Sequence, residues 1–197
     1  IVGFVAPFLE KKLPEGLNLI VGALAIAPLA RIIAIAVDPV VNSTLLNIGR
    51  MISAAAEQSP LIMGFLLGGI MKMICTSPLS SMALTAMLGL DGLAMGIAAI
   101  ACVGGSFTNG IIFDRLKLGE RSNVIAVMLE PLTQADIITQ NPIPIYGSNF
   151  FGGGLAGLAA AMLGIINNAP GTASPIPGLL APFGFNPPLK VVAAIVL

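Results

Sequence analysis

The sequence contains no histidine and no tryptophan, and only 9% of its 197 residues are charged. Without histidine, the chain cannot use histidine-based acid–base catalysis, a Ser-His-Asp triad or a histidine-ligated metal. Soluble domains usually carry about a quarter charged residues, whereas 56% of this chain is hydrophobic. The charged groups are too few to cover a soluble surface, so we expect a membrane protein.

The balance of charge and the small number of cysteines exclude further classes of function. Nine basic and nine acidic residues cancel, so no excess positive charge favours nucleic acid as a partner. The chain has two cysteines, Cys75 and Cys102, and both lie in apolar stretches outside any CxxC pair. We expect them to be buried small hydrophobic side chains, and we expect no metal site and no cofactor.

Ionisable residues inside or beside long apolar runs are the most informative feature that is present. A charge at hydrocarbon depth is costly, so it usually faces a bundle interior or a water-filled cavity where a ligand is bound or moved. The pattern therefore indicates a transport protein. The residues are Arg31, Arg50, Glu57, Lys72, Asp91, Glu130 and Asp136.

The apolar runs predict an all-α, polytopic transmembrane helical bundle. At roughly 20 residues per span, a single transmembrane domain over residues 1–197 has room for about five or six spanning or near-spanning helices. Asp38-Pro39 and the glycine-rich residues 104–110 are expected to end helices, and Asp91-Gly92 to form a turn. The expected helices cover residues 19–37, 42–59 (amphipathic, at an interface or lining a cavity), 61–75, 82–103 (two short helices if Asp91-Gly92 is a turn) and 150–166.

The two ends of the chain are apolar runs, residues 1–9 and 191–197. Each is shorter than the roughly 20 residues that cross a bilayer as a helix, and the first lacks the basic start and cleavage site of a signal peptide. We therefore expect a fragment of a longer permease. Residues 114–123 form the most strongly charged loop and predict the cytoplasmic side, although Lys11-Lys12 competes for that assignment.

Small residues recur at four-residue spacing in three of the apolar segments. Such a face lets two helix backbones approach closely, within one chain or between copies of it in a homo-oligomer. The pairs are Gly64 and Gly68, Gly92 and Gly96, and Gly153 and Gly157, the last extended by Ala161.

Two stretches, residues 130–149 and 167–188, are too polar for a lipid-facing helix and rich in proline or glycine. Irregular backbone at membrane depth has to be buried in protein or line water. We interpret both stretches as re-entrant or broken-helix elements. Because broken helices present backbone groups and helix ends to a ligand, they predict the position of the substrate site.

Glu130 is the leading candidate for a ligand contact. Pro131 disfavours helical geometry at the residue before it, and a carboxylate at such a break can accept two hydroxyl hydrogen bonds, which suits a polyhydroxy ligand. The alternative is a structural cap, or an ion-pair partner for Lys72 or Arg31. The remaining candidates for the substrate-binding set are Gln134, Asn141, Asn149 and Thr172, with Ser174 and Asn186 as further polar groups of the second stretch.

Four segments in this order resemble the membrane-embedded IIC family of the bacterial phosphoenolpyruvate-dependent phosphotransferase system, in a branch that includes PfoR-type membrane proteins. The resemblance extends from about Asn42 to the end of the chain, which would correspond to the C-terminal part of such a protein. The segments are NSTLLNIGRMISAAAEQSPLIMGFLLG, CTSPLSSMAL, LEPLTQADIITQNPIPIYGSNFFGGGLAG and GTASPIPGLLAPFGF.

The resemblance implies a multi-pass sugar permease of the bacterial inner (plasma) membrane. A IIC component binds sugar from outside and presents it to a cytoplasmic IIB subunit, its partner, for phosphorylation. Glu130-Pro131 is similar to a Glu-Pro pair whose Glu contacts sugar hydroxyls in the glucose-type members. The phosphocysteine motif of IIB is absent, so this chain would carry no phosphoryl group itself and has no catalytic residue of that kind.

Two other classes of function remain open on the sequence. One is an ion-coupled secondary transporter or channel, in which Asp91, Glu130 or Asp136 titrates or binds a cation. The other is a membrane regulator that senses a ligand without transporting it.

Overall fold

The computed structural model of the protein describes residues 17–197, and within that range the regular elements are helices, with no strand. The expected all-α class is confirmed. The chain divides into two compact units, Ile1–Thr44 and Leu45–Leu197. The predictions for residues 1–9 and for Lys11-Lys12 lie outside the described residues.

The helix α2 spans Leu17–Gln58 without interruption and contributes residues to both units. We expected Asp38-Pro39 to end a helix and a second helix to begin near residue 42, and both expectations are wrong. Pro39 removes one donor from the helix ladder but does not stop the chain from continuing. The hydroxyls of Ser43 and Thr44 donate to the Val40 carbonyl oxygen at 3.1 and 2.8 Å, which are bonds inside a helix rather than caps of its start.

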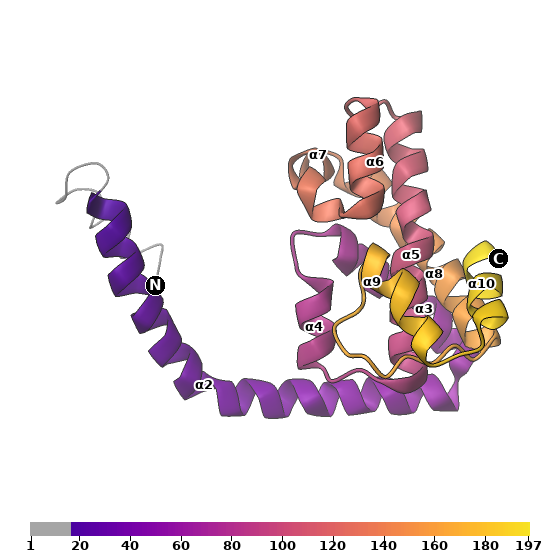
Figure 1. Ribbon diagram of the computed structural model, residues 1–197, viewed down its shortest axis with the longest axis horizontal. Helices are drawn as coiled ribbons and strands as arrows, with labels where there is room; N and C mark the ends of the chain where they lie inside the picture. The colour runs from indigo at the N-terminus through magenta and orange to yellow at the C-terminus, as the bar shows by residue number, and fades with distance from the viewer. Residues whose placement is uncertain (1–16) are drawn as a thin grey trace. The chain divides into compact units, whose positions relative to one another are not determined.

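The second unit holds the remaining helices (Figure 1). In chain order they are α3 (Pro60–Thr76), α4 (Ser81–Met87), α5 (Gly92–Arg115), α6 (Arg121–Leu129), η1 (Pro131–Gln134), α7 (Ala135–Gln140), α8 (Pro142–Met162), α9 (Pro175–Leu180), η2 (Ala181–Gly184) and α10 (Pro188–Val196). Here α denotes an α-helix and η a 3₁₀ helix.

Proline begins helices in this unit more often than it interrupts them. A proline occupies the first or second position of α3, η1, α8, α9, η2 and α10. At these positions the missing N–H costs nothing, because the first turn of a helix has no acceptor for it, and the fixed φ already suits the helix. The prolines therefore start helices of different lengths, and α8 includes residues 142–149, which we expected to be irregular and to precede a helix beginning at residue 150.

The course of α5 corrects one prediction and confirms another. Residues 104–110 do not form a break, because α5 continues through them to Arg115. Their glycines serve packing instead, since Gly104 faces Ala156 of α8. The expected turn at Asp91-Gly92 is confirmed, because α4 ends at Met87 and α5 begins at Gly92, whose φ is +56°.

The core of the second unit is the contact of α3, α5 and α8. The closest approach joins the glycines of α3 to those of α8. A Cβ atom added at Gly68 would lie 2.6 Å from the Gly153 carbonyl oxygen, and one at Gly64 would lie 2.7 Å from the Ala161 Cβ. The small-residue face predicted from Gly153, Gly157 and Ala161 is therefore a helix-packing surface.

Lys72 lies inside this core and has no exposed surface. Its methylene stem occupies the space that Gly105 of α5 and Gly153 of α8 leave open. Its Nζ donates to the Cys102 carbonyl oxygen at 3.3 Å, and among the described residues it forms no ion pair. The glycines thus make room for a long cationic side chain where a larger residue would exclude it.

One helical turn further along the same three helices lies a chain of buried polar side chains. Asn109 Nδ2 donates to Thr76 Oγ1 at 3.2 Å, and Asn149 Nδ2 donates to Asn109 Oδ1 at 2.5 Å. Asn149 Oδ1 is buried without a protein partner. Directional bonds of this kind fix the rotation of each helix about its axis more strictly than apolar contact does.

The broken stretch that follows α8 is tied to the core at several points. The backbone N–H of Asn167 donates to the Gly92 carbonyl oxygen at 2.9 Å. The side chain of Asn186 bonds both backbone groups of Ile166, at 3.0 and 2.6 Å. Gly178 of α9 packs on the Ala99 backbone of α5. Residues 167–188 are therefore held in place along α5 rather than forming a free loop.

Two of the described helices are long and apolar enough to cross a bilayer by length and composition. They are the part of α2 from Ala30 to Gln58, and α5 over Gly92–Arg115. The apolar helix α3 is shorter, at 17 residues. The exposed large hydrophobic side chains of these helices are the surface that a bilayer would cover.

Two glycine-to-alanine substitutions in α8 should have different effects on stability. A Cβ at Gly157 would collide with the Gly64 carbonyl oxygen and lie 2.8 Å from Gly68 Cα, whereas one at Gly147 meets nothing within 4 Å. We expect Gly157→Ala to lower the free energy of unfolding by about 1–3 kcal/mol through overpacking. Gly147→Ala should leave it unchanged or raise it by up to about 1 kcal/mol through helix propensity.

Thermal unfolding of both variants in the same detergent checks this prediction. Equal melting temperatures for the two variants would show that α3 and α8 do not meet through their glycines.

Candidate functional site

Three breaks in the helical chain meet around one small hollow of about 110 Å³. One break joins α3 to α4, the second joins α6 to η1, and the third precedes α9. The two stretches predicted to be broken, residues 130–149 and 167–188, each contribute a side chain to it. The lining residues are Cys75, Leu79, Ser80, Ser81, Met82, Glu130, Leu132 and Ser174.

The link from α3 to α4 contributes a thiol and two hydroxyls. Cys75 lies in the last turn of α3. Ser80 caps α4, since its Oγ accepts from the Ala83 N–H at 3.1 Å. The Ser81 hydroxyl donates to the Ala173 carbonyl oxygen at 2.6 Å, which fastens the start of α4 to the segment before α9.

Glu130 ends α6 and caps η1. Its Oε1 accepts from the Leu132 N–H at 3.4 Å, and no donor among the described residues reaches Oε2. The capping role named as the structural alternative is therefore present, but it is long and uses a single oxygen. Because the side chain is exposed at the hollow, the second oxygen remains available to a ligand.

The hollow combines one carboxylate, three serine hydroxyls and a thiol with an apolar rim. A carboxylate accepts hydrogen bonds, and a hydroxyl both donates and accepts them. Leu79 and Leu132 of the rim are exposed. A few polar groups converging beside apolar side chains are typical of sites for small ligands.

The other predicted ligand contacts from the first broken stretch lie outside this hollow. Gln134 follows Glu130 in η1, but its Oε1 accepts from Asn123 Nδ2 at 2.7 Å and so ties η1 to the start of α6. Asn141 Nδ2 donates to the Ile137 carbonyl oxygen at 3.1 Å at the end of α7. As ligand contacts, Gln134 and Asn141 stay predictions.

Asn149 and Thr172 are also separate from the hollow. Asn149 belongs to the buried polar chain between α5 and α8. Thr172 Oγ1 accepts from Asn167 Nδ2 and donates to the Ala169 carbonyl oxygen, both at 2.8 Å, so it shapes the turn before α9. Ser174, two residues further on, is the member of that stretch that lines the hollow.

From the sequence we did not expect Cys75, Ser80 or Ser81 at a binding site. The signal that predicted the other two breaks was also present here, because the polar Thr76-Ser77-Pro78 follows an apolar helix directly. The expectation that Cys75 is buried is confirmed, since the residue is 6% exposed.

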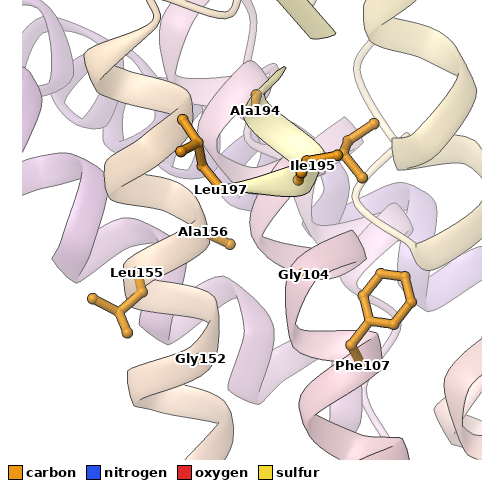
Figure 2. Close-up of a pocket in the computed structure, with 9 residues that line it drawn as sticks. Gly104, Phe107, Gly152, Leu155, Ala156, Ala194, Ile195 and Leu197 are labelled. Atoms are coloured by element: carbon orange, nitrogen blue, oxygen red, sulfur yellow. The ribbon is translucent and has the colours of Figure 1, made fainter. Parts of the chain in front are cut away.

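A second and larger hollow, of about 400 Å³, lies between α5, α8 and α10 (Figure 2). Its walls carry no charged side chain and no hydroxyl, so no side chain there donates or accepts a hydrogen bond. The lining residues are Gly104, Phe107, Gly152, Leu155, Ala156, Ala194, Ile195, Val196 and Leu197.

The charged loop between α5 and α6 is a tight, well-capped turn. The side chains of Glu120 and Asn123 form a reciprocal capping box at the start of α6. Lys117 adopts a left-handed conformation with φ of +53°, which is uncommon for a non-glycine residue. The side chains of Arg115, Lys117 and Arg121 are all exposed, so the loop presents its basic groups to solvent or to a partner.

Comparison with known proteins gives one informative match. The family model described as "Phosphotransferase system, EIIC" matches residues 1–197, which is the whole chain. No curated protein and no solved structure matches the chain significantly. The chain therefore belongs to the EIIC family, the membrane-bound sugar permease component of the phosphotransferase system.

Proposed function

We propose that this protein carries a sugar through the hollow around Glu130 and presents it to a cytoplasmic IIB subunit, which phosphorylates it. The observation that supports this most directly is the meeting of Glu130 and Ser174. They come from two separate proline-rich breaks, 44 positions apart in the sequence, and line the same hollow. Broken helices that converge on one point are the usual construction of a transporter substrate site.

In this proposal Glu130 orients two neighbouring hydroxyls of the sugar through its carboxylate oxygens. The hydroxyls of Ser80 and Ser174 supply donors that a polyhydroxy ring also needs, and Ser81, whose proton is donated to the Ala173 carbonyl oxygen, offers an acceptor. Sites that enclose whole drug-sized ligands measure about 300–1,000 Å³, so the 110 Å³ hollow admits only part of a sugar ring. The exposed rim residues would have to move apart when the whole ring enters.

The remaining predicted residues enter the proposal as contacts made in a second conformation. Gln134, Asn141, Asn149 and Thr172 would exchange their present protein hydrogen bonds for sugar hydroxyls as the broken elements move. Asn149 has one acceptor free for this without losing a bond, because its Oδ1 is unpartnered. Such exchange is the motion expected of a carrier that alternates access to its site.

The placement in the membrane is part of the same proposal. The chain would cross the inner membrane several times, with residues 130–149 and 167–188 as re-entrant elements. The loop with Arg115, Lys117 and Arg121 would face the cytoplasm, following the excess of basic residues there. It would then lie on the side from which IIB approaches.

Radiolabelled sugar uptake tests the proposed function. We expect vesicles that contain the full-length protein to accumulate phosphorylated sugar only when IIB and its phosphoryl donors are supplied. Accumulation of unmodified sugar driven by a sodium or proton gradient would instead identify an ion-coupled carrier. Binding of sugar without any transport under both conditions would identify a sensor.

Replacing Glu130 tests the site. The substitution Glu130→Gln keeps the shape but removes the charge that strengthens two hydroxyl hydrogen bonds, so the apparent affinity for sugar should fall about tenfold or more. Asp136→Asn is the matched control, because Asp136 is exposed on α7 and does not line the hollow.

Concentration-dependent uptake by the two variants gives the measurement. If both variants lose the same affinity, or neither does, the ligand does not contact Glu130.

Thiol labelling locates the ligand independently of transport. Cys75 lines the hollow, whereas Cys102 is 0% exposed. In a Cys102→Ala protein, a small methanethiosulfonate reagent should modify Cys75, and bound sugar should slow the reaction several-fold. A Cys75→Ala protein, which keeps only Cys102, should react far more slowly with or without sugar.

Mass spectrometry of the labelled protein follows both reactions. Sugar that leaves the rate at Cys75 unchanged would place the binding site elsewhere.

A further inference from the structure

A third hollow, of about 380 Å³, lies between the last turns of α2 and the turn that joins α4 to α5. It shares no lining residue with the hollow around Glu130. Its lining residues are Leu46, Arg50, Ser53, Ala54, Glu57, Leu88, Gly89 and Asp91.

The two walls of this hollow are held together by a close backbone contact. Gly49 of α2 is buried, and a Cβ atom there would collide with the Leu88 carbonyl oxygen. Gly89 reverses the chain with φ of +59° and faces the side chain of Leu46. This contact places Asp91, on the far side of the turn, at the same hollow as Arg50 and Glu57, which are seven residues apart on one face of α2.

The charges around this hollow do not neutralise one another. Among the described residues, Arg50, Glu57 and Asp91 form no ion pair, and the guanidinium of Arg50 makes no hydrogen bond. Asp91 precedes the first residue of α5, yet its side chain does not cap that helix. One cation and two carboxylates therefore surround an open space of molecular size with their hydrogen-bonding groups unused.

The surroundings of the hollow are apolar. On α2, the side chains of Leu46, Ile48 and Met51 are all exposed, and Met87 at the end of α4 is exposed as well. A charged recess bordered by exposed aliphatic side chains matches the boundary between lipid headgroups and acyl chains. The family assignment places such a surface in a membrane protein.

We propose that this hollow binds the phosphoethanolamine headgroup of a phospholipid. The Arg50 guanidinium would hold the phosphate, for which its planar fork of donors is suited. The primary ammonium would donate to Glu57 and Asp91, with Ser53 available to the phosphate oxygens. The acyl chains would lie along the exposed aliphatic side chains of α2.

The two carboxylates give this site its selectivity. A choline headgroup has the same charges but no N–H group to donate, so it would lose the bonds to Glu57 and Asp91. A glycerol headgroup carries the phosphate without a cation, so its hydroxyls can donate to the carboxylates but leave both negative charges without a compensating positive charge. The site should therefore prefer phosphatidylethanolamine to phosphatidylcholine and to phosphatidylglycerol.

Lipid competition on the purified, delipidated protein tests the proposal. The protein is equilibrated in mixed micelles that hold equal amounts of these three phospholipids with identical acyl chains, and native mass spectrometry identifies the lipids that stay bound. We expect phosphatidylethanolamine to be retained about tenfold or more over each of the others, as the loss of a charged hydrogen bond implies.

Variants test separately the binding of the phosphate and the binding of the ammonium group. The double substitution Glu57→Gln with Asp91→Asn should remove the preference for ethanolamine over choline while phospholipid still binds. Arg50→Gln should weaken the binding of all three lipids. The matched controls, Asp114→Asn and Arg121→Gln, remove exposed charges of the α5–α6 region and should leave the preference unchanged.

Three outcomes would overturn the proposal. One is a wild-type protein with no preference for phosphatidylethanolamine, and another is a preference that survives the double substitution. The third is binding of free O-phosphoethanolamine as tight as that of the lipid, which would assign the hollow to a soluble ligand. Circular dichroism of each variant verifies that a lost preference does not reflect lost folding.

Discussion

The close contact between the glycines of α3 and α8 is the constraint on which the rest of the second unit depends. Where backbone meets backbone, no side chain holds the helices apart, and α5 can pack along both. The same lack of side chains at Gly105 and Gly153 gives Lys72 its place. A buried ammonium with one carbonyl acceptor is costly, so its position depends on the surrounding helices being fixed, and the bonds from Thr76 through Asn109 to Asn149 help to fix them.

The groups of the candidate site lie where this core ends. The helices α3, α5 and α8 run straight through the core, whereas the hollow around Glu130 is made at the end of α3 and at the starts of α4, η1 and α9. Helix ends leave backbone donors and acceptors unused and let the chain change direction. A stable bundle that carries broken segments at its margin thus offers both a fixed frame and groups able to exchange partners with a ligand.

Much of this organisation could be predicted from the sequence. Composition and the apolar runs indicated an all-α membrane protein, and the family match agrees with the resemblance found in the motifs. The predictions failed at glycine and proline residues, because each can either end a helix or be accommodated inside one. Residues 104–110 were expected to break a helix, but their glycines permit close packing in the middle of α5. Pro39 was expected to end a helix that α2 continues past. Local propensity cannot distinguish these cases, because the deciding contacts come from distant segments.

The sequence by itself determined the class of the protein, its lack of histidine, and the position of Glu130 directly before a proline. These properties follow from composition and from neighbours along the chain. Only the tertiary structure decided which polar residues share a space with Glu130. It brought Cys75, Ser80, Ser81 and Ser174 there and left Asn149 in the core. It also joined Asp91 to Arg50 and Glu57. The physical reason is that proximity between breaks depends on how the helices between them pack, and that packing depends on contacts between residues far apart in the sequence.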